Sequence, residues 1–162
     1  MVVMGFAIAL TVAMAAVIIL DATRYLIPNS LNFAILLLWL AAIFFLPAHI
    51  PMALAAAAIM LVVGLGFFAL GLMGGGDIKL LVVLTLWLGW GMQTIHFIVL
   101  TAVMGGVLVI LMLLIRAAGQ LLARGHTLPR FFTPKQPVPY GLAIAAAFLL
   151  MLWRDAVPMI TL

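Results

Sequence analysis

The sequence contains very little charge and no cysteine. Only 6% of its 162 residues are charged, whereas 70% are hydrophobic. A soluble domain of this size needs more charge on its water-facing surface, so the composition predicts an integral membrane protein. The absence of cysteine excludes disulfides, a thiol nucleophile and a thiolate metal site. The formal net charge of +4 does not indicate nucleic-acid binding, because the basic residues are scattered along the chain.

Acidic residues are the scarcest charged class. The chain has three, Asp21, Asp77 and Asp155. Asp21 ends the first apolar run, and Asp77 follows a triple glycine between two apolar runs. Ionisable residues at membrane depth are costly to bury and are functional candidates by default. Asp155 follows Arg154 near the end of the sequence, and we interpret it as solvated and inert.

Six apolar segments predict an all-α bundle of about six transmembrane helices in a single domain over residues 1–162. A spanning helix needs about 20 mostly apolar residues. The fourth segment is the weakest, because it is short and carries Lys79 near its start. The first has no basic flank and no small-residue cleavage site, so we expect a retained helix rather than a signal peptide. The segments are residues 2–20, 31–46, 52–73, 78–90, 97–115 and 138–153.

The basic residues predict the orientation of the bundle. Six of the seven follow the first, third and fifth segments, namely Arg24, Lys79, Arg116, Arg124, Arg130 and Lys135. Only Arg154 falls on the other side. Positive residues collect in cytoplasmic loops, so both termini are expected outside. Asp21, Asp77 and a basic loop over residues 119–136 are expected at the cytoplasmic face.

Small and aromatic residues predict packing and membrane anchoring. Membrane helices approach closely where their residues are small. We expect such contacts at Gly64, Gly66, Gly71, Gly75, Gly105, Gly106 and Gly141. Trp87, Trp90 and Trp153 are expected to anchor the bundle at the membrane interfaces.

Two carboxylates at one membrane face can hydrolyse a peptide bond. Held close together they share a proton, so one can act as general base on a water and the other as general acid toward the carbonyl. Asp77 stands at a helix start, where the macrodipole favours negative charge, and Asp21 at a helix end, where it does not. We therefore predict Asp77 as the ionised base and Asp21 as its protonated partner.

Each aspartate also has a simpler structural interpretation. Asp77 is a suitable helix N-cap after a glycine turn, assisted by Lys79. Asp21 can pair with Arg24 three residues later. However, the chain has few acidic residues, and two of them are expected at the same membrane face. This coincidence favours the functional interpretation.

The residues around the aspartates also predict local structure. Pro28 marks a turn, with Asn29 or Ser30 capping the next helix. The glycines at 74–76 are expected to adopt backbone conformations closed to other residues and to approach a neighbour or a substrate. A phosphate-binding loop is disfavoured, because no Lys-Ser or Lys-Thr pair follows them.

Three motifs, in order, resemble the type IV prepilin peptidase family, which comprises membrane aspartic proteases of the GxGD class related to archaeal preflagellin peptidases. GxGD alone is a weak signal, but the set of three spans nearly the whole chain and is specific. The resemblance implies that Asp21 and Asp77 are catalytic and that the other motif residues support the site. The motifs are Asp21 with Ile27-Pro28-Asn29, then Gly74-x-Gly76-Asp77-Ile78-Lys79, then Val138-Pro139-Tyr140-Gly141.

The resemblance implies cleavage of the short basic leader of pilin-like precursors at the cytoplasmic face of a bacterial inner membrane. Larger bifunctional members carry a cytoplasmic insertion with paired cysteines, linked to N-methylation of the trimmed pilin. This chain has neither, so it resembles the small branch that serves Flp/Tad-type pili, and methyltransferase activity is not expected. The expected partners are a prepilin and the lipid bilayer, without nucleic acid. No metal or other cofactor is expected, and His49, His96 and His126 fall in three separate segments.

Other functions fit parts of the pattern. A small proton-coupled transporter can use the same two aspartates as a relay. A carboxylate pair at one face and the lack of a repeat between the two halves argue against it. A non-catalytic assembly subunit would tolerate loss of both carboxylates. A GxGD protease acting on another membrane substrate is a further alternative.

Overall fold

The computed structural model describes residues 1–46, 48–122, 138–154 and 157. Within them the chain forms six α-helices and no strand, as the sequence predicts. Most of the predicted basic loop, with Arg124, His126, Arg130 and Lys135, lies outside the described residues, as does Asp155. The helices are α1 (Val2–Arg24), α2 (Asn29–Ala42), α3 (Ile50–Ala69), α4 (Gly75–Leu88), α5 (Met92–Leu122) and α6 (Tyr140–Leu152).

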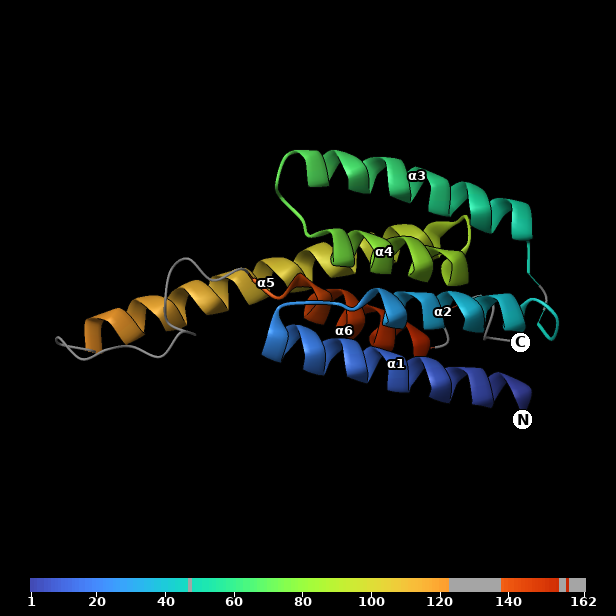
Figure 1. The fold of residues 1–162 in the computed structure, drawn as a ribbon, viewed down its shortest axis with the longest axis horizontal. Helices are drawn as coiled ribbons and strands as arrows, with labels where there is room; N and C mark the ends of the chain where they lie inside the picture. The colour runs from blue at the N-terminus through green and yellow to red at the C-terminus, as the bar shows by residue number, and fades with distance from the viewer. Residues whose placement is uncertain (47, 123–137, 155–156, 158–162) are drawn as a thin grey trace.

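Successive helices run in opposite directions along a common axis (Figure 1). The α1–α2 connection, the α3–α4 connection and the start of α6 therefore lie at one end of the bundle, which we call the site end. The N-terminus and the α4–α5 connection lie at the opposite end. This alternation places Asp21 and Asp77 at the same end, as predicted.

Three helices are long and apolar enough to cross a membrane, and the bundle is that of a helical membrane protein. They are α1, α3 and α5, and α2 and α6 are shorter apolar helices. Helix α5 continues to Leu122, so the predicted loop from residue 119 is wrong for its first four residues. No proline interrupts the chain there. Helix α6 begins at Tyr140 rather than at residue 138, because Pro139 takes the N-cap position.

Helix α4, the weakest candidate in the sequence, lies at the centre of the bundle. It packs against α2, α3, α5 and α6, and nine of its 14 residues are buried. Trp87 is 1% exposed and lies near the ring of Phe6, so its predicted place at the membrane interface is wrong. Trp90 and Trp153 are exposed. The indole N–H of Trp39 on α2 donates to the carbonyl of Leu86 at 2.9 Å, which satisfies one of the carbonyls left free at the end of α4.

Glycines contribute unequally to helix packing. A Cβ on Gly64 would lie 2.6 Å from Ile78, so this glycine permits the close approach of α3 to α4. Gly105 has the same function beside Tyr140. The predicted contacts at Gly66, Gly71 and Gly106 are wrong, because a Cβ at any of these positions would meet no atom of the described residues within 4 Å.

Candidate active site

Asp21 lies in the last turn of α1 and is almost completely buried, with 4% of its surface exposed. Its carboxylate Oδ2 accepts a hydrogen bond from the backbone N–H of Leu142 at 3.0 Å. Gly141, the preceding residue, also lies against this carboxylate. Both belong to the first turn of α6, where unpaired N–H groups and the helix dipole favour an anion. Arg24, the partner in the simpler interpretation of Asp21, is exposed.

Gly141 allows this arrangement because it has no side chain. A Cβ at this position would lie 2.8 Å from Oδ2 of Asp21 and 2.6 Å from Cδ1 of Ile27. Both distances are shorter than those that real Cβ atoms show. The start of α6 can therefore approach the carboxylate only with glycine at position 141.

Asp77 lies in the first turn of α4, two residues after Gly75, the first helical residue. Its carboxylate lies close to Gly74, the N-cap residue, since a Cβ on Gly74 would lie 3.0 Å from Oδ2 of Asp77. In a capping box the third helical residue reaches back to the N-cap in this way. Asp77 is therefore the third residue of α4 and not its N-cap.

The two carboxylates lie near each other. Asp77 is within electrostatic reach of Asp21, although 56 residues separate them in the sequence. Asp21 is buried and Asp77 is half-buried. Two carboxylates within electrostatic reach disfavour double ionisation, so they can hold one proton between them. The site end thus contains a carboxylate pair at the junction of α1, α4 and α6.

In the structure, the helix macrodipole no longer distinguishes the two aspartates. If only the helix that carries each residue is considered, Asp77 is at a helix start and Asp21 at a helix end. Asp21 also accepts a hydrogen bond at the start of α6, and Asp77 lies in the first turn of α4, so both carboxylates lie at a helix amino end. The dipole rule no longer selects Asp77 as the ionised member.

The α1–α2 connection holds the three helix ends together through Ile27. Ile27 is buried, and a Cβ on Gly76 would lie 3.2 Å from its Cβ and 3.3 Å from its backbone oxygen. Gly76 and Gly141 therefore allow α4 and α6 to pack against the same residue. The three motifs that carry the resemblance converge on this point.

The triple glycine is used for close packing rather than for unusual backbone angles. Gly74 has φ −72° and ψ 149°, which other residues also adopt, and Gly75 and Gly76 are helical. The prediction of conformations closed to other residues is therefore wrong, whereas the prediction of a close approach holds at Gly76.

Residues at the start of α2 fasten this helix to α4. The cap of α2 is Pro28, without a side-chain cap bond, so the prediction of Asn29 or Ser30 as cap is wrong. Asn29 is the first helical residue, and its Oδ1 accepts a hydrogen bond from Nζ of Lys79 at 2.8 Å. Lys79 therefore joins α4 to α2 rather than assisting the cap of α4.

Asn32 is a residue of the site that sequence reasoning missed. It is 4% exposed, and its Nδ2 donates to the carbonyl of Gly76, next to Asp77, at 3.4 Å. Its Oδ1 has no hydrogen-bond partner in the described structure. A buried asparagine in an apolar helix, three residues after Asn29, was the available signal.

Taken together, the pair has the groups that acid–base chemistry on a carbonyl requires. One carboxylate can take a proton from water and the other can donate one to an oxygen. Within the described residues, no group of three or more His, Cys, Asp or Glu could hold a metal ion.

The fold and site define a helical membrane protein with a carboxylate pair at one end of its bundle. The sequence profile of the type IV leader peptidase family matches residues 8–110 of the chain. This match covers more than half of the chain and includes both aspartates, so the chain belongs to the type IV leader peptidase family. The resemblance noted in the motifs is confirmed. The family implies a peptidase whose substrates are pilin-like precursors.

The match does not reach the third motif, residues 138–141, although the structure places Gly141 of this motif against Asp21. No match was found among curated proteins or among solved structures.

Proposed function

We propose that this protein is an aspartic endopeptidase that removes the short basic leader of Flp-type prepilins, with Asp21 and Asp77 as its catalytic residues. The observation that carries the proposal is the convergence of these two carboxylates, that of Asp21 buried and that of Asp77 half-buried, at the junction of three helix ends. They are the only acidic residues among those described. Membership of the leader peptidase family supports the reaction class.

The proposed reaction uses one carboxylate as base and the other as acid. The ionised carboxylate takes a proton from a water, and the water oxygen bonds to the scissile carbonyl carbon. The protonated carboxylate gives its proton to the carbonyl oxygen. When the C–N bond breaks, the nitrogen leaves with a proton from the first carboxylate. The second carboxylate takes back a proton from a hydroxyl of the tetrahedral intermediate as the C=O bond re-forms, so the two aspartates again share one proton.

The charges at the site end support a cytoplasmic location of the reaction. Arg24 and Lys79 lie on helix ends beside the pair, whereas Arg154 lies beyond the opposite end of α6. Under the positive-inside rule the site end faces the cytoplasm, where the basic leader of a membrane-inserted prepilin also remains. The inner membrane is the expected location. Without cysteines or a cytoplasmic insertion, the protein is not expected to methylate the trimmed pilin.

The test is cleavage of a Flp-type prepilin by the purified protein in liposomes. Wild type should release the leader in the presence of a chelator. Asp21→Asn and Asp77→Asn should each lose at least about 10³-fold in kcat, because a residue that acts within a catalytic unit is not replaced by its partner. The matched control is Asp155→Asn, which makes the same substitution at the third acidic residue and should retain activity. Full activity of either of the first two variants would remove that residue from the chemistry.

A further inference from the structure

The first turn of α6 has no side-chain cap of its own. Its N-cap residue is Pro139, which makes no side-chain hydrogen bond, so the N–H groups of this turn need partners from elsewhere. The N–H of Leu142 lies 3.3 Å from the carbonyl oxygen of Pro139 and 3.0 Å from the carboxylate of Asp21. Asp21 on α1 therefore acts for α6 as an N-cap side chain would. Whatever holds this turn in place also holds its hydrogen bond to Asp21.

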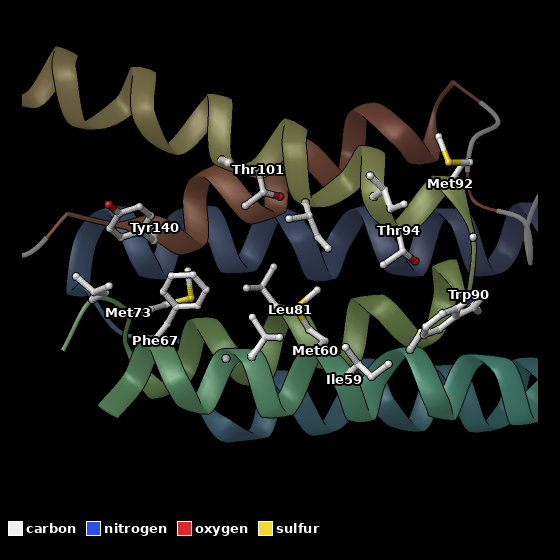
Figure 2. Close-up of a pocket in the computed structure, with 18 of the residues that line it drawn as sticks. Ile59, Met60, Phe67, Met73, Leu81, Trp90, Met92, Thr94, Thr101 and Tyr140 are labelled. Carbon is white, nitrogen blue, oxygen red and sulfur yellow. The ribbon is translucent and has the colours of Figure 1, made fainter. Parts of the chain in front are cut away.

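Tyr140, the first residue of α6, connects this turn to α5. A Cβ on Gly105 of α5 would lie 3.3 Å from Cε1 and 3.4 Å from Cδ1 of Tyr140, so the ring lies against the backbone of this buried glycine. The contact is made by ring carbons and not by the hydroxyl. Tyr140 and Met73 lie at one end of an apolar pocket, and Trp90 lies at the other (Figure 2). The ring of Tyr140 is therefore at the site end of the bundle.

The two residues after Tyr140 contact Asp21 on the other side of α6. A Cβ on Gly141 would lie 2.8 Å from Oδ2 of Asp21, and Leu142 donates the hydrogen bond. Helix α6 packs on both α1 and α5, and within the described helices those two do not contact each other. The first turn of α6 thus lies between Asp21 and Gly105. Without the ring, the turn could move toward α5 and away from the carboxylate.

The remaining contacts between α5 and α6 do not replace the ring of Tyr140. Phe97 and Phe148 are fully buried and pack edge to face with their centroids 6.0 Å apart. Phe148 is eight residues beyond Tyr140, or about 12 Å along the helix. Ala143 is the other residue near Gly105, and its Cβ is 4.0 Å from the position of the added Cβ. A single methyl group at that distance leaves the ring of Tyr140 as the main contact of the first turn with α5.

We propose that Tyr140 is a positioning residue for the reaction. Its ring, in contact with Gly105, keeps the first turn of α6 where the N–H of Leu142 meets Asp21. Tyr140 acts through Leu142 and takes no part in the chemistry. The proposal rests on the peptidase function proposed above, and it includes Gly105, which belongs to none of the three motifs.

The first test measures amide hydrogen exchange by mass spectrometry in detergent and does not depend on cleavage. In Tyr140→Ala, exchange over the first turn of α6 should be about tenfold faster or more, because the bond from Leu142 opens more often, while α4 keeps the wild-type rate. Asp21→Ala removes the acceptor and should accelerate exchange in the same turn. Tyr140→Phe keeps the ring and should exchange as wild type does. Unchanged exchange in Tyr140→Ala, or an equal rise in every helix, would overturn the proposal.

A control variant separates positioning from general stability. Phe148→Leu disturbs the same α5–α6 contact away from the site. It should lower the melting temperature, but exchange in the first turn of α6 and kcat per folded molecule should stay at the wild-type values. A loss of kcat in Phe148→Leu as large as that in Tyr140→Ala would show that α6 as a whole, and not Tyr140, sets the rate.

The second test measures kcat and KM for prepilin per folded molecule. Tyr140→Ala should lower kcat about tenfold with KM within about twofold of wild type, and Tyr140→Phe should keep the wild-type kcat. Gly105→Leu displaces the ring and should resemble Tyr140→Ala. Its matched control is Gly106→Leu, the same change at the next residue, which is exposed and has no neighbour within 4 Å among the described residues. A kcat as low in Tyr140→Phe as in Tyr140→Ala would overturn the proposal, because it would assign the effect to the hydroxyl.

The two proposals fail in different ways. Wild-type kcat and exchange in Tyr140→Ala would refute the positioning role and leave the peptidase function intact. Wild-type protein that cleaves no prepilin would refute the peptidase function, and the exchange experiment would still decide whether Tyr140 holds the first turn of α6 against Asp21.

Discussion

Replacing Gly141 by alanine tests whether the start of α6 must touch Asp21. The added Cβ would lie 2.8 Å from Oδ2 of Asp21, whereas ordinary contact begins at 3.4 Å, so the carboxylate must retreat by about 0.6 Å. The hydrogen bond from Leu142 is 3.0 Å long in the native site and would be stretched or broken. The same Cβ would lie 2.6 Å from Ile27, which must also repack.

The expected loss can be worked from these contacts. A hydrogen bond to a charged group contributes about 1.5–3 kcal/mol, which corresponds to about tenfold to hundredfold in rate if the bond holds Asp21 in its reactive position. Overpacking against Ile27 should lower the free energy of unfolding by about 1–3 kcal/mol. We therefore expect Gly141→Ala to fold, to melt earlier and to cleave prepilin about tenfold to a hundredfold more slowly.

The assay is prepilin cleavage at saturating substrate, together with thermal unfolding in detergent. Gly66→Ala is the matched control, because it adds the same methyl group to a helical glycine that has no neighbour within 4 Å in the described part of the chain. It should keep wild-type kcat and gain about 0.5–1 kcal/mol of stability. A Gly141→Ala variant whose kcat lies within about twofold of wild type would show that the contact between α6 and Asp21 is not needed for the reaction.

Two further substitutions separate positioning from stability. Asn32→Leu removes both the 3.4 Å hydrogen bond to Gly76 and a buried oxygen without a partner. The free energy of unfolding should therefore be unchanged or higher, while kcat falls about threefold to tenfold. A fall in stability with unchanged kcat would contradict a positioning role. Trp39→Phe removes the buried 2.9 Å hydrogen bond to Leu86 at the far end of α4. It should lower the free energy of unfolding by about 1–3 kcal/mol and leave kcat nearly unchanged. Thermal unfolding and prepilin cleavage check these two values, and an unchanged melting temperature would show that this bond contributes no stability.

The sequence was sufficient to predict the number of helices and the shared end of the two aspartates. Apolar runs of nearly spanning length, joined by short connections, must alternate in direction, and this alternation brings Asp21 and Asp77 together. The burial of α4 could not be predicted in the same way. When lipid and protein interior are equally apolar, hydropathy does not distinguish Trp87, which is in the core, from Trp90, which is exposed.

The finer structure of the site depends on contacts between distant segments. The N–H of Leu142 lies 121 residues from Asp21 in the sequence, and no local pattern indicates that the start of α6 faces that carboxylate. Likewise, Gly106 and Gly141 have identical chemistry in the sequence. Only the packed bundle shows that one meets open space and the other meets Asp21.

The shortness of α2 has a consequence for the surrounding membrane. Its 14 residues extend about 21 Å, whereas the hydrocarbon core of a bilayer is about 30 Å thick. Its exposed face carries Phe33, Leu37 and Leu40, so we expect a surrounding bilayer to thin locally at this face, at a cost of a fraction of a kcal/mol per Å. A thinner bilayer beside α2 would shorten the distance from bulk water to the start of α4. We therefore expect the lipid to ease the supply of water to the carboxylate pair.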